Sequence, residues 1–235
     1  MKPKYLLFSS AILLMLLLTG CSSSGVSQNG TIVGTVVDNT SGLAFWSGQA
    51  TIAGKTVQIS SGQFEITNIP AGTHMLTVTK AHYQDKSIQV HVSNGRIMVE
   101  VKMEPSYSAA HLDLFARLVQ AESGGESYEG QVAVAASVLN RVRHHNYPNT
   151  LNGVIMQRDN RGYAQYSPID NGAINTPAGQ NAKDAVRDAL AGWDPSQGAT
   201  GFFAPNKVPN KNNWVWQQVP IVQIGNHLFF RAQID

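Results

Sequence analysis

The sequence predicts a chain of two parts, a small all-β sandwich followed by a mainly helical α+β domain. Three observations predict this order. Apolar and polar residues alternate between Thr31 and Met103, helical spacing replaces the alternation from about His111 onward, and Pro105 separates the two patterns. A chain of 235 residues is long enough for two modest domains that each bury a core. We therefore expect a β module over 31–104 and a second domain over 105–235.

The N-terminal residues have the pattern of a secretory signal. Lys2 and Lys4 precede an apolar stretch over 5–18, which ends in Leu18-Thr19-Gly20-Cys21. This ending resembles the lipobox of bacterial lipoproteins, which implies cleavage before Cys21, a diacylglyceryl thioether on its sulfur and often an N-acyl chain. Two or more acyl chains anchor a protein stably where one does not. The alternatives are a cleaved signal with an incidental cysteine, or an uncleaved anchor helix.

We accordingly interpret residues 1–20 as a lipoprotein signal peptide and 21–30 as the lipidated Cys21 with a polar linker. The chain is then expected to be an exported lipoprotein, anchored to the outer face of the cell or spore membrane. Its only cysteine excludes an intramolecular disulfide.

Period-two alternation predicts the strands of the β module. Apolar residues alternate with Thr, Gln and Ser in four segments, and turn signals separate the segments every eight to twelve residues or so. The turn signals are Asn39-Thr40-Ser41-Gly42, Ser60-Ser61-Gly62, Pro70-Ala71-Gly72 and Ser93-Asn94-Gly95.

Two phrases in this module, at 34–38 and 62–74, resemble the carboxypeptidase-regulatory type of transthyretin-like β-sandwich. The resemblance implies a non-catalytic spacer or contact surface, so a protein partner could bind there. Its histidines are scattered and are interpreted as structural. Trp46 or Tyr83 could stack on sugars, although core or edge packing is the preferred interpretation for both.

The second domain begins after Pro105, where Ser106-Tyr107-Ser108 can cap a helix. Leu114, Leu118 and Ala121 recur at helical spacing, which predicts a first helix that ends near Glu122. A second helix over 128–143 is apolar on nearly every side and is therefore expected at the centre of the domain.

A third helix is expected to begin at Thr176-Pro177 and to stop at Gly192. A short β-like stretch over 219–230 follows near the end of the chain. Trp214 and Trp216, two positions apart, are expected to face one side of a strand, where they would line a groove or complete the core.

Glu122 is the strongest candidate for chemistry. It ends an apolar helical run just before Gly124-Gly125, where its carboxyl group can be partly desolvated. Desolvation raises the pKa of a carboxyl group and allows it to act as a general acid near neutral pH. Ordinary surface charge beside a helix C-terminus is the alternative.

Composition and spacing exclude several other functions. The 17 basic and 15 acidic residues nearly balance, without a basic helix face, so nucleic acid is not an expected partner. The adjacent His144 and His145 point to different faces, so no metal site and no cofactor are predicted. Ser123 and Ser167 lack the glycines of a nucleophile elbow.

The region from about His111 to Arg231 resembles the catalytic domain of cell-wall hydrolases of the SleB/CwlJ type, known from spore-cortex lysis during germination. The resemblance implies a lysozyme-like α+β domain that degrades peptidoglycan. One departure is Phe202-Phe203-Ala204-Pro205, where Asn-Pro is expected after the aromatic pair, and the usual upstream peptidoglycan-binding domain is not recognised. The segments that carry the resemblance are 116–122, 128–136, 138–142, 147–150, 153–155, 165–169, 189–195 and 224–229.

From this resemblance we expect a lytic transglycosylase that uses Glu122 alone as acid and base on the bond between N-acetylmuramic acid and N-acetylglucosamine. Tyr166, Ser167, Asp170 and Asn140 are the candidates for substrate binding, whereas Arg141 and His227 are interpreted as structural. The alternatives are a hydrolytic muramidase or glucosaminidase, which needs a second carboxylate, and a non-catalytic glycan-binding lipoprotein.

Overall fold

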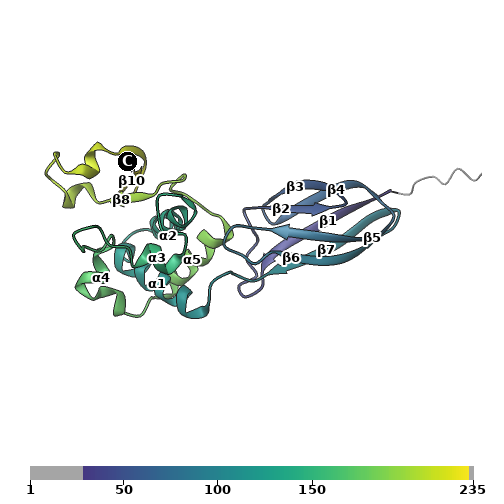
Figure 1. Ribbon diagram of the computed structural model, residues 1–235, viewed down its shortest axis with the longest axis horizontal. Helices are drawn as coiled ribbons and strands as arrows, with labels where there is room; N and C mark the ends of the chain where they lie inside the picture. Colours follow the sequence, from purple (N-terminus) through teal and green to yellow (C-terminus); the bar gives the residue numbers. More distant parts are fainter. Residues whose placement is uncertain (1–28, 233–235) are drawn as a thin grey trace, which may run out of the picture.

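The computed structural model describes residues 29–232, which form a β part and a helical part arranged end to end (Figure 1). The β part ends at Met103 and the first long helix begins at Ala109. The predicted boundary at Pro105 therefore falls in the short connection between the two parts. The predicted signal peptide and Cys21 lie outside the described residues. No helix among residues 29–232 is long and apolar enough to cross a membrane.

A seven-stranded sheet builds the β part, in the order β6-β5-β2-β3-β4-β1-β7. The two end strands of this order, β6 and β7, lie side by side, so the sheet curls back on itself (Figure 1). The strands are β1 (Asn29–Asp38), β2 (Ser47–Ile52), β3 (Lys55–Ser60), β4 (Gln63–Pro70), β5 (Gly72–Thr79), β6 (Lys86–Val92) and β7 (Gly95–Met103).

The alternation seen in the sequence is confirmed by the burial of the strands. Phe64 and Ile66 of β4 point into the core, as do Leu76 and Val78 of β5. Gly34 pairs with Phe64 across β1 and β4, and a Cβ atom at Gly34 would lie 2.1 Å from the Phe64 ring. Glycine therefore allows this aromatic ring to pack directly on the neighbouring backbone.

Strands β1 and β7 are paired in parallel over nine residues, from Gly30–Gly95 to Asp38–Met103, whereas all the other strand pairs of this sheet are antiparallel. Because the first and last strands run in the same direction, the chain enters the β part at one end and leaves it at the other. The ten residues of β1 span about 30 Å.

Helix α2 lies at the centre of the helical part, as its all-round apolar sequence predicts. Every residue from Gly130 to Arg141 is buried. Ser108 caps α1 by accepting a hydrogen bond from the backbone N–H of His111. The helices are α1 (Ala109–Ser123), α2 (Tyr128–Arg143), α3 (Leu151–Ile155), α4 (Ser167–Asn171) and α5 (Gln180–Ala191), with 3-10 turns η1 (Ala173–Asn175), η2 (Pro205–Lys207) and η3 (Trp214–Gln217).

A small antiparallel sheet in the order β8-β10-β9 completes the helical part. Its strands are β8 (Gly201–Phe203), β9 (Val219–Ile224) and β10 (His227–Arg231). The predicted β-like stretch near the end of the chain is thus a hairpin of β9 and β10.

Two predictions about local structure are wrong. Helix α5 begins at Gln180 rather than at Thr176-Pro177, because those residues follow the 3-10 turn η1 in extended conformation. Trp214 and Trp216 lie on η3 rather than on a strand, so they do not share a face. The predicted end of α5 is confirmed, since Gly192 caps it with a φ angle of +107°.

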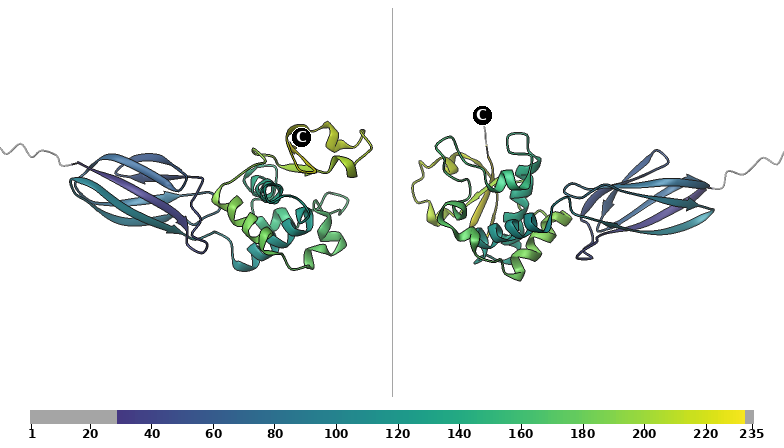
Figure 2. Two further views of the ribbon diagram at one scale, coloured as in Figure 1. Left: turned by 180° about the vertical axis from the view of Figure 1, so that it is seen from behind. Right: turned by 60° about the horizontal axis from the view of Figure 1, so that its bottom comes forward.

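The two parts lie end to end in both views of Figure 2, and hydrogen bonding and packing join them. The backbone N–H of Trp46 donates to the carbonyl of Ala191 at the end of α5, at 2.9 Å. The buried apolar side chains of the β part and of the helical part form one continuous cluster. The β part is therefore packed against the helical part and not merely tethered to it.

Candidate active site

Glu122 lies in the last turn of α1, as predicted. The backbone N–H of Gly124 donates to the carbonyl of Gln120, which closes the helix. At this end of α1, Glu122 lines an open pocket of about 390 Å³. We call it the Glu122 pocket. Its walls are residues 120–126, residues 204, 206 and 207 around η2, and residues 226–227 at the turn of the β9–β10 hairpin.

Burial raises the pKa of the Glu122 carboxyl group to about 7. The positive charges of Arg141 and Lys207 oppose this rise but do not cancel it. Since a group with this pKa is about half protonated at neutral pH, Glu122 can both give and accept a proton there. This is the environment that the sequence predicts for a general acid.

Arg141 links α2 to the small sheet beside Glu122. Its Nε donates to the carbonyl of Thr200 at 2.5 Å, which agrees with the predicted structural role. Its guanidinium group also lies between two aromatic rings, 5.1 Å from the centre of Tyr147 and 5.0 Å from that of Tyr166. The side chain is thereby held in place.

Two buried polar atoms near Glu122 have no hydrogen-bond partner among the described residues, namely Arg141 Nη1 and the hydroxyl group of Tyr166. Tyr166 is only 3% exposed, and burial, with a smaller contribution from the charge of Glu122, raises the pKa of its hydroxyl group to about 12. Such atoms are normally satisfied by a ligand or by water. The Tyr166 ring is buried and Arg141 lies over it, so the ring presents no open face for a sugar in this structure.

Glu126 is a second carboxylate in the Glu122 pocket, with a different environment. It accepts hydrogen bonds from the backbone N–H and the side-chain amide of Asn226, both at 3.0 Å. These bonds hold its pKa below the usual value. Glu126 is therefore ionised at neutral pH, and it fastens the β9–β10 hairpin to the loop between α1 and α2.

Lys207 and His227 also line the Glu122 pocket, and sequence reasoning did not identify them as part of a site. His227 is buried, its Nδ1 has no partner among the described residues, and burial lowers its pKa. Lys207 lies in none of the segments that carry the family resemblance, and His227 lies in the segment 224–229 but was expected to be structural. They reach Glu122 only through the fold of the C-terminal segment.

None of the four predicted substrate-binding residues, Tyr166 included, lines the Glu122 pocket. Asn140 is a correction, because its amide group donates to Asp194 and to the carbonyl of Ala199, both at 3.0 Å, and accepts from Arg143. These bonds occupy both ends of the amide inside the domain.

Asp170 is a similar correction. Its carboxylate pairs with Arg158 at 2.7 Å and accepts from the backbone N–H of Ala164 at 3.0 Å, so it closes its own loop. The same two bonds lower its pKa. Ser167 is exposed at the first residue of α4.

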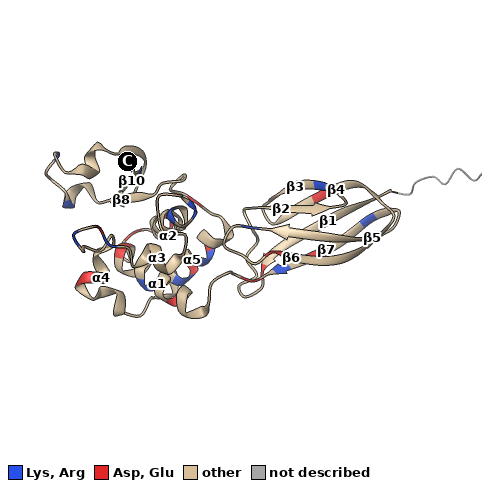
Figure 3. Cartoon of the chain, viewed as in Figure 1, with Lys and Arg blue, Asp and Glu red and all other residues tan. Residues whose placement is uncertain are grey.

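No group of three His, Cys, Asp or Glu side chains within residues 29–232 could hold a metal ion. His74 and His91 lie on β5 and β6, and His82 lies in the loop between these strands. Basic and acidic residues are interspersed along the helical part (Figure 3).

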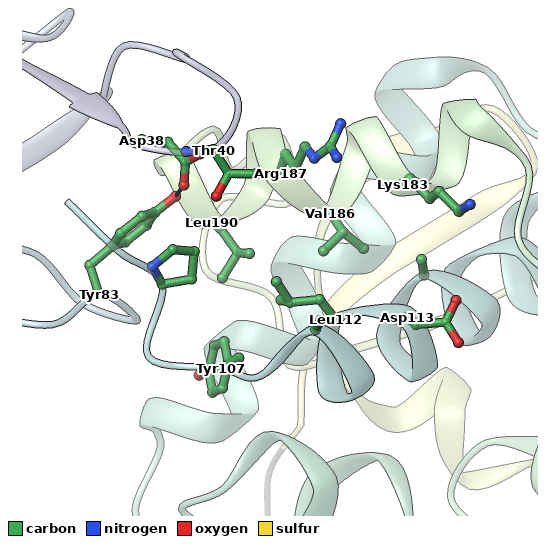
Figure 4. A pocket seen from close by; sticks show the side chains of 13 residues that line it. Asp38, Thr40, Tyr83, Tyr107, Leu112, Asp113, Lys183, Val186, Arg187 and Leu190 are labelled. Atoms are coloured by element: carbon green, nitrogen blue, oxygen red, sulfur yellow. Dashed lines mark hydrogen bonds between the residues drawn. The ribbon is translucent and has the colours of Figure 1, made fainter. Parts of the chain in front are cut away.

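A second pocket, of about 350 Å³, lies where the β part meets α1 and α5 (Figure 4). The Asp38 carboxylate at its upper edge accepts hydrogen bonds from the Tyr83 hydroxyl group at 2.9 Å and from the backbone N–H of Thr40 at 3.0 Å. Both carboxylates of this pocket are engaged within the protein, Asp38 by Tyr83 and Asp113 by an ion pair with Arg117. The Glu122 pocket is therefore the one equipped for acid catalysis.

Comparison with known proteins identifies similarity over the helical part. Residues 125–230 match the family model described as cell wall hydrolase. The spore cortex-lytic enzyme of Bacillus cereus is 41% identical over 123 residues, which is 52% of this chain and 45% of that protein. The corresponding enzyme of Bacillus subtilis is 36% identical over 131 residues, 56% of this chain and 41% of that protein. The chain thus spans less than half the length of these curated relatives.

Two solved structures are similar to the same region. The catalytic domain of the germination-specific lytic transglycosylase SleB from Bacillus anthracis is 38% identical, with a TM-score of 0.49 over 54% of this chain and 98% of that chain. The catalytic domain of the Bacillus cereus SleB protein is 39% identical, with a TM-score of 0.48 over 54% of this chain and 93% of that chain.

Proposed function

Because residues 125–230 belong to the cell wall hydrolase family, we propose that this protein cuts the glycan strands of peptidoglycan as a lytic transglycosylase. The observation that carries the proposal is the Glu122 pocket, in which one carboxyl group has a pKa of about 7 and the other is ionised. An enzyme that uses a single residue as acid and then as base needs a group of this kind.

The proposed reaction begins with protonated Glu122. It donates its proton to the glycosidic oxygen between N-acetylmuramic acid and N-acetylglucosamine, and the bond from the muramoyl anomeric carbon to that oxygen breaks. Glu122, now a carboxylate, takes the proton from the C6 hydroxyl group of the same muramoyl residue. The C6 oxygen attacks the anomeric carbon and closes a 1,6-anhydro ring, and Glu122 is protonated again for the next cycle.

Arg141 and Tyr166 support this chemistry from one side of Glu122. The fixed positive charge of Arg141 stabilises the carboxylate form, which is needed for the second proton transfer. The hydroxyl group of Tyr166 is buried and has no partner within the described residues, so we propose that it binds substrate, or a water molecule that substrate contacts, when the site is occupied.

Hydrolysis is the second candidate, and Glu126 is the observation that favours it. An ionised carboxylate in the same pocket could activate a water molecule, as the second residue of an inverting glycosidase does. However, Glu126 already accepts two hydrogen bonds from Asn226, which makes it a weaker base.

Mass spectrometry of fragments released from purified peptidoglycan distinguishes these reactions. We expect muropeptides with 1,6-anhydro ends from the parent protein and none from Glu122→Gln. Glu129→Gln is the matched control, because Glu129 is an exposed carboxylate in the first turn of α2 and does not line the Glu122 pocket. Reducing ends in place of anhydro ends would establish hydrolysis. The absence of any release by the parent would support a non-catalytic glycan-binding protein.

We further propose spore cortex as the preferred substrate, since the curated relatives described above are spore cortex-lytic enzymes. Cortex peptidoglycan contains muramic lactam, whereas vegetative wall does not. The same assay on both materials tests the proposal, and equal release from the two would contradict it.

Membrane attachment through Cys21 is also a proposal. It is supported by the basic residues, the apolar stretch and the lipobox-like ending at the N-terminus of the sequence. Metabolic labelling with a radioactive fatty acid in a bacterial host tests it. We expect label in the parent and none in Cys21→Ser, and label in both would locate the lipid elsewhere.

A further inference from the structure

Three aromatic rings form a row at the junction of the two parts. Trp46 precedes β2, Trp193 follows α5, and Tyr128 is the first residue of α2. The rings of Trp46 and Trp193 are stacked, with centres 6.1 Å apart and planes 20° apart. The rings of Trp193 and Tyr128 are also 6.1 Å apart, with planes at 45°. We call this row the junction aromatics.

Hydrogen bonds fix both ends of the row. The backbone N–H of Trp46 donates to the carbonyl of Ala191 at 2.9 Å. The hydroxyl group of Tyr128 donates to the Asp188 carboxylate at 2.5 Å. The rings are thus pre-organised, which reduces the entropy that a ligand must remove when it binds.

The row is open to solvent. Trp46 is 56% exposed and Tyr128 is 37% exposed. Trp46 is therefore not a core residue, whereas Tyr83, the other aromatic residue considered for sugar stacking, is 6% exposed and packs on Phe45. Exposed aromatic rings that carry a polar tip are suited to ligands with an apolar face and polar edges, and a pyranose ring is such a ligand.

Two cations lie beside the junction aromatics. Lys80 and Arg143 line a small cavity of about 60 Å³ together with Ser47 and Gly192, the sequence neighbours of Trp46 and Trp193. The Asp194 carboxylate also lines this cavity, where it accepts hydrogen bonds from Asn140 and from the backbone N–H of Gly198. Neither cation makes an ion pair within residues 29–232. The charge of Arg143, added to burial, lowers the pKa of Lys80 to about 8, so Lys80 remains mostly charged at neutral pH. An anionic ligand would relieve this repulsion.

One end of the row lies close in sequence to the Glu122 pocket. Tyr128 follows Glu126 by two residues, and Glu126 lines that pocket. A polymer that leaves the Glu122 pocket along the start of α2 therefore meets Tyr128 first and the β part last.

We propose that the junction aromatics, flanked by Lys80 and Arg143, bind the peptidoglycan strand outside the Glu122 pocket. The rings stack on pyranose faces of the glycan, and the two cations attract the carboxylates of its stem peptides. The β part is then a component of the substrate-binding surface and not only a spacer. This inference rests on the proposed function, because it takes the same polymer as its ligand.

Sedimentation with purified, insoluble peptidoglycan tests the proposal. All variants carry Glu122→Gln, so binding is measured without cleavage. We expect Trp46→Leu to weaken binding about tenfold, the loss of roughly one stacking contact, and Trp46→Phe to retain most of it. Met98→Ala is the control, because Met98 is 69% exposed on β7 of the same part and is expected to bind like the parent.

A second comparison tests the cations. We expect Lys80→Gln to weaken binding to intact peptidoglycan but not to peptidoglycan whose stem peptides an amidase has removed. A purely structural role of Lys80 would give the same loss on both materials. This variant also keeps the proposal testable if Trp46→Leu does not fold.

The outcomes separate this inference from the proposed function. Suppose the parent protein releases anhydro-muropeptides but Trp46→Leu and Lys80→Gln bind as tightly as the parent. The proposed binding role of the junction aromatics is then wrong, and the proposed function stands. If binding depends on Trp46 and Lys80 but no cleavage occurs, the surface stands and the catalytic proposal fails.

Discussion

Glu122 predicts the pH dependence of the reaction. In the proposed reaction its acid form starts the cleavage, and burial raises its pKa to about 7. The protonated fraction therefore falls as the pH rises through 7, and above pH 8 it decreases about tenfold per pH unit. We expect kcat/KM to fall along the alkaline limb with an apparent pKa near 7. Initial rates on solubilised glycan strands between pH 5 and 9 measure this, and an alkaline limb near pH 5 would remove Glu122 from the role of acid.

The same pKa makes a prediction about stability. The folded protein holds the Glu122 proton up to about pH 7, while the unfolded chain loses it near 4.5. The folded state therefore binds more protons between these values, and its stability decreases as the pH rises through this window. Glu122→Gln lacks the penalty. We expect it to be more stable than the parent at pH 8, by at most about 3 kcal/mol, and equally stable near pH 4. Urea unfolding at both pH values checks this.

Tyr166→Phe separates function from packing. The Tyr166 hydroxyl group is buried and has no partner within the described residues, so its removal is not expected to lower the melting temperature. If the hydroxyl group contacts substrate, kcat/KM should decrease about tenfold. Thermal unfolding and steady-state kinetics on the same preparation provide both values. A large drop in melting temperature would mean that the hydroxyl group has a structural partner.

Among single residues, Glu122 can be recognised from the sequence as a candidate acid because its environment depends on residues close to it in the sequence. Helical spacing places Leu118 in the core, and Gly124 ends the helix one turn later. Lys207 and His227 lie 85 and 105 positions further on, and only tertiary contacts bring them to Glu122. The environment of Asn140 is equally non-local, because its amide bonds to residues more than 50 positions away.

Among the elements, the β9–β10 hairpin has the closest connection to the site. Its turn residue Gly225 has a φ angle of +56°, and a Cβ atom there would lie 2.3 Å from a Glu126 carboxylate oxygen. That oxygen is held by Asn226 and cannot move away freely. Gly225→Ala should therefore lower stability by about 1–2 kcal/mol and also reduce activity.

Gly162→Ala is the matched control for this change. Gly162 has a φ angle of +88° with no atom near the position of a Cβ, so its substitution introduces backbone strain alone. The difference in melting temperature between the two variants gives the cost of displacing Glu126. If Gly225→Ala and Gly162→Ala lose stability and activity to the same extent, the contact between Gly225 and Glu126 makes no specific contribution.

The sequence predicts an element well where one periodicity runs unbroken. The bounds of α2 are those predicted, because its apolar residues leave no alternative to burial. Helix α5 begins later than predicted. Thr176 and Pro177 have the sequence of a helix N-terminus, but they follow the 3-10 turn η1 and remain outside the helix. The sequence predicts a strand where the structure has the η3 turn, because two tryptophans at a spacing of two fit a strand as well as a tight turn.

The whole molecule is expected to unfold in one step. The buried apolar residues of the two parts form a continuous cluster. Leu190, which is 1% exposed, lines the pocket of about 350 Å³ where the β part meets α1 and α5. Leu190→Ala should destabilise the protein by about 2–5 kcal/mol. It should shift the far-ultraviolet dichroism and the tryptophan fluorescence transitions by the same amount. Two separate transitions in the parent would contradict a cooperative junction.

The division into two parts could be predicted from the change of periodicity near Pro105, but their contact could not. The backbone bond from Trp46 to Ala191 joins positions 145 residues apart. Nothing in the local pattern of either segment indicates which surface of each part is covered. The parallel pairing of β1 with β7 is likewise a property of the completed sheet.

That parallel pair has a mechanical consequence. Suppose the N-terminal end of the chain is fixed and the helical part holds on to the wall. Tension then enters at Asn29 and leaves at Met103, at opposite ends of two strands paired over nine residues. The load acts along the strands, so the hydrogen bonds of the pair resist it together in shear instead of opening one after another. If the proposed function holds, the β part can therefore bear tension between an anchored N-terminal end and a polymer bound by the helical part.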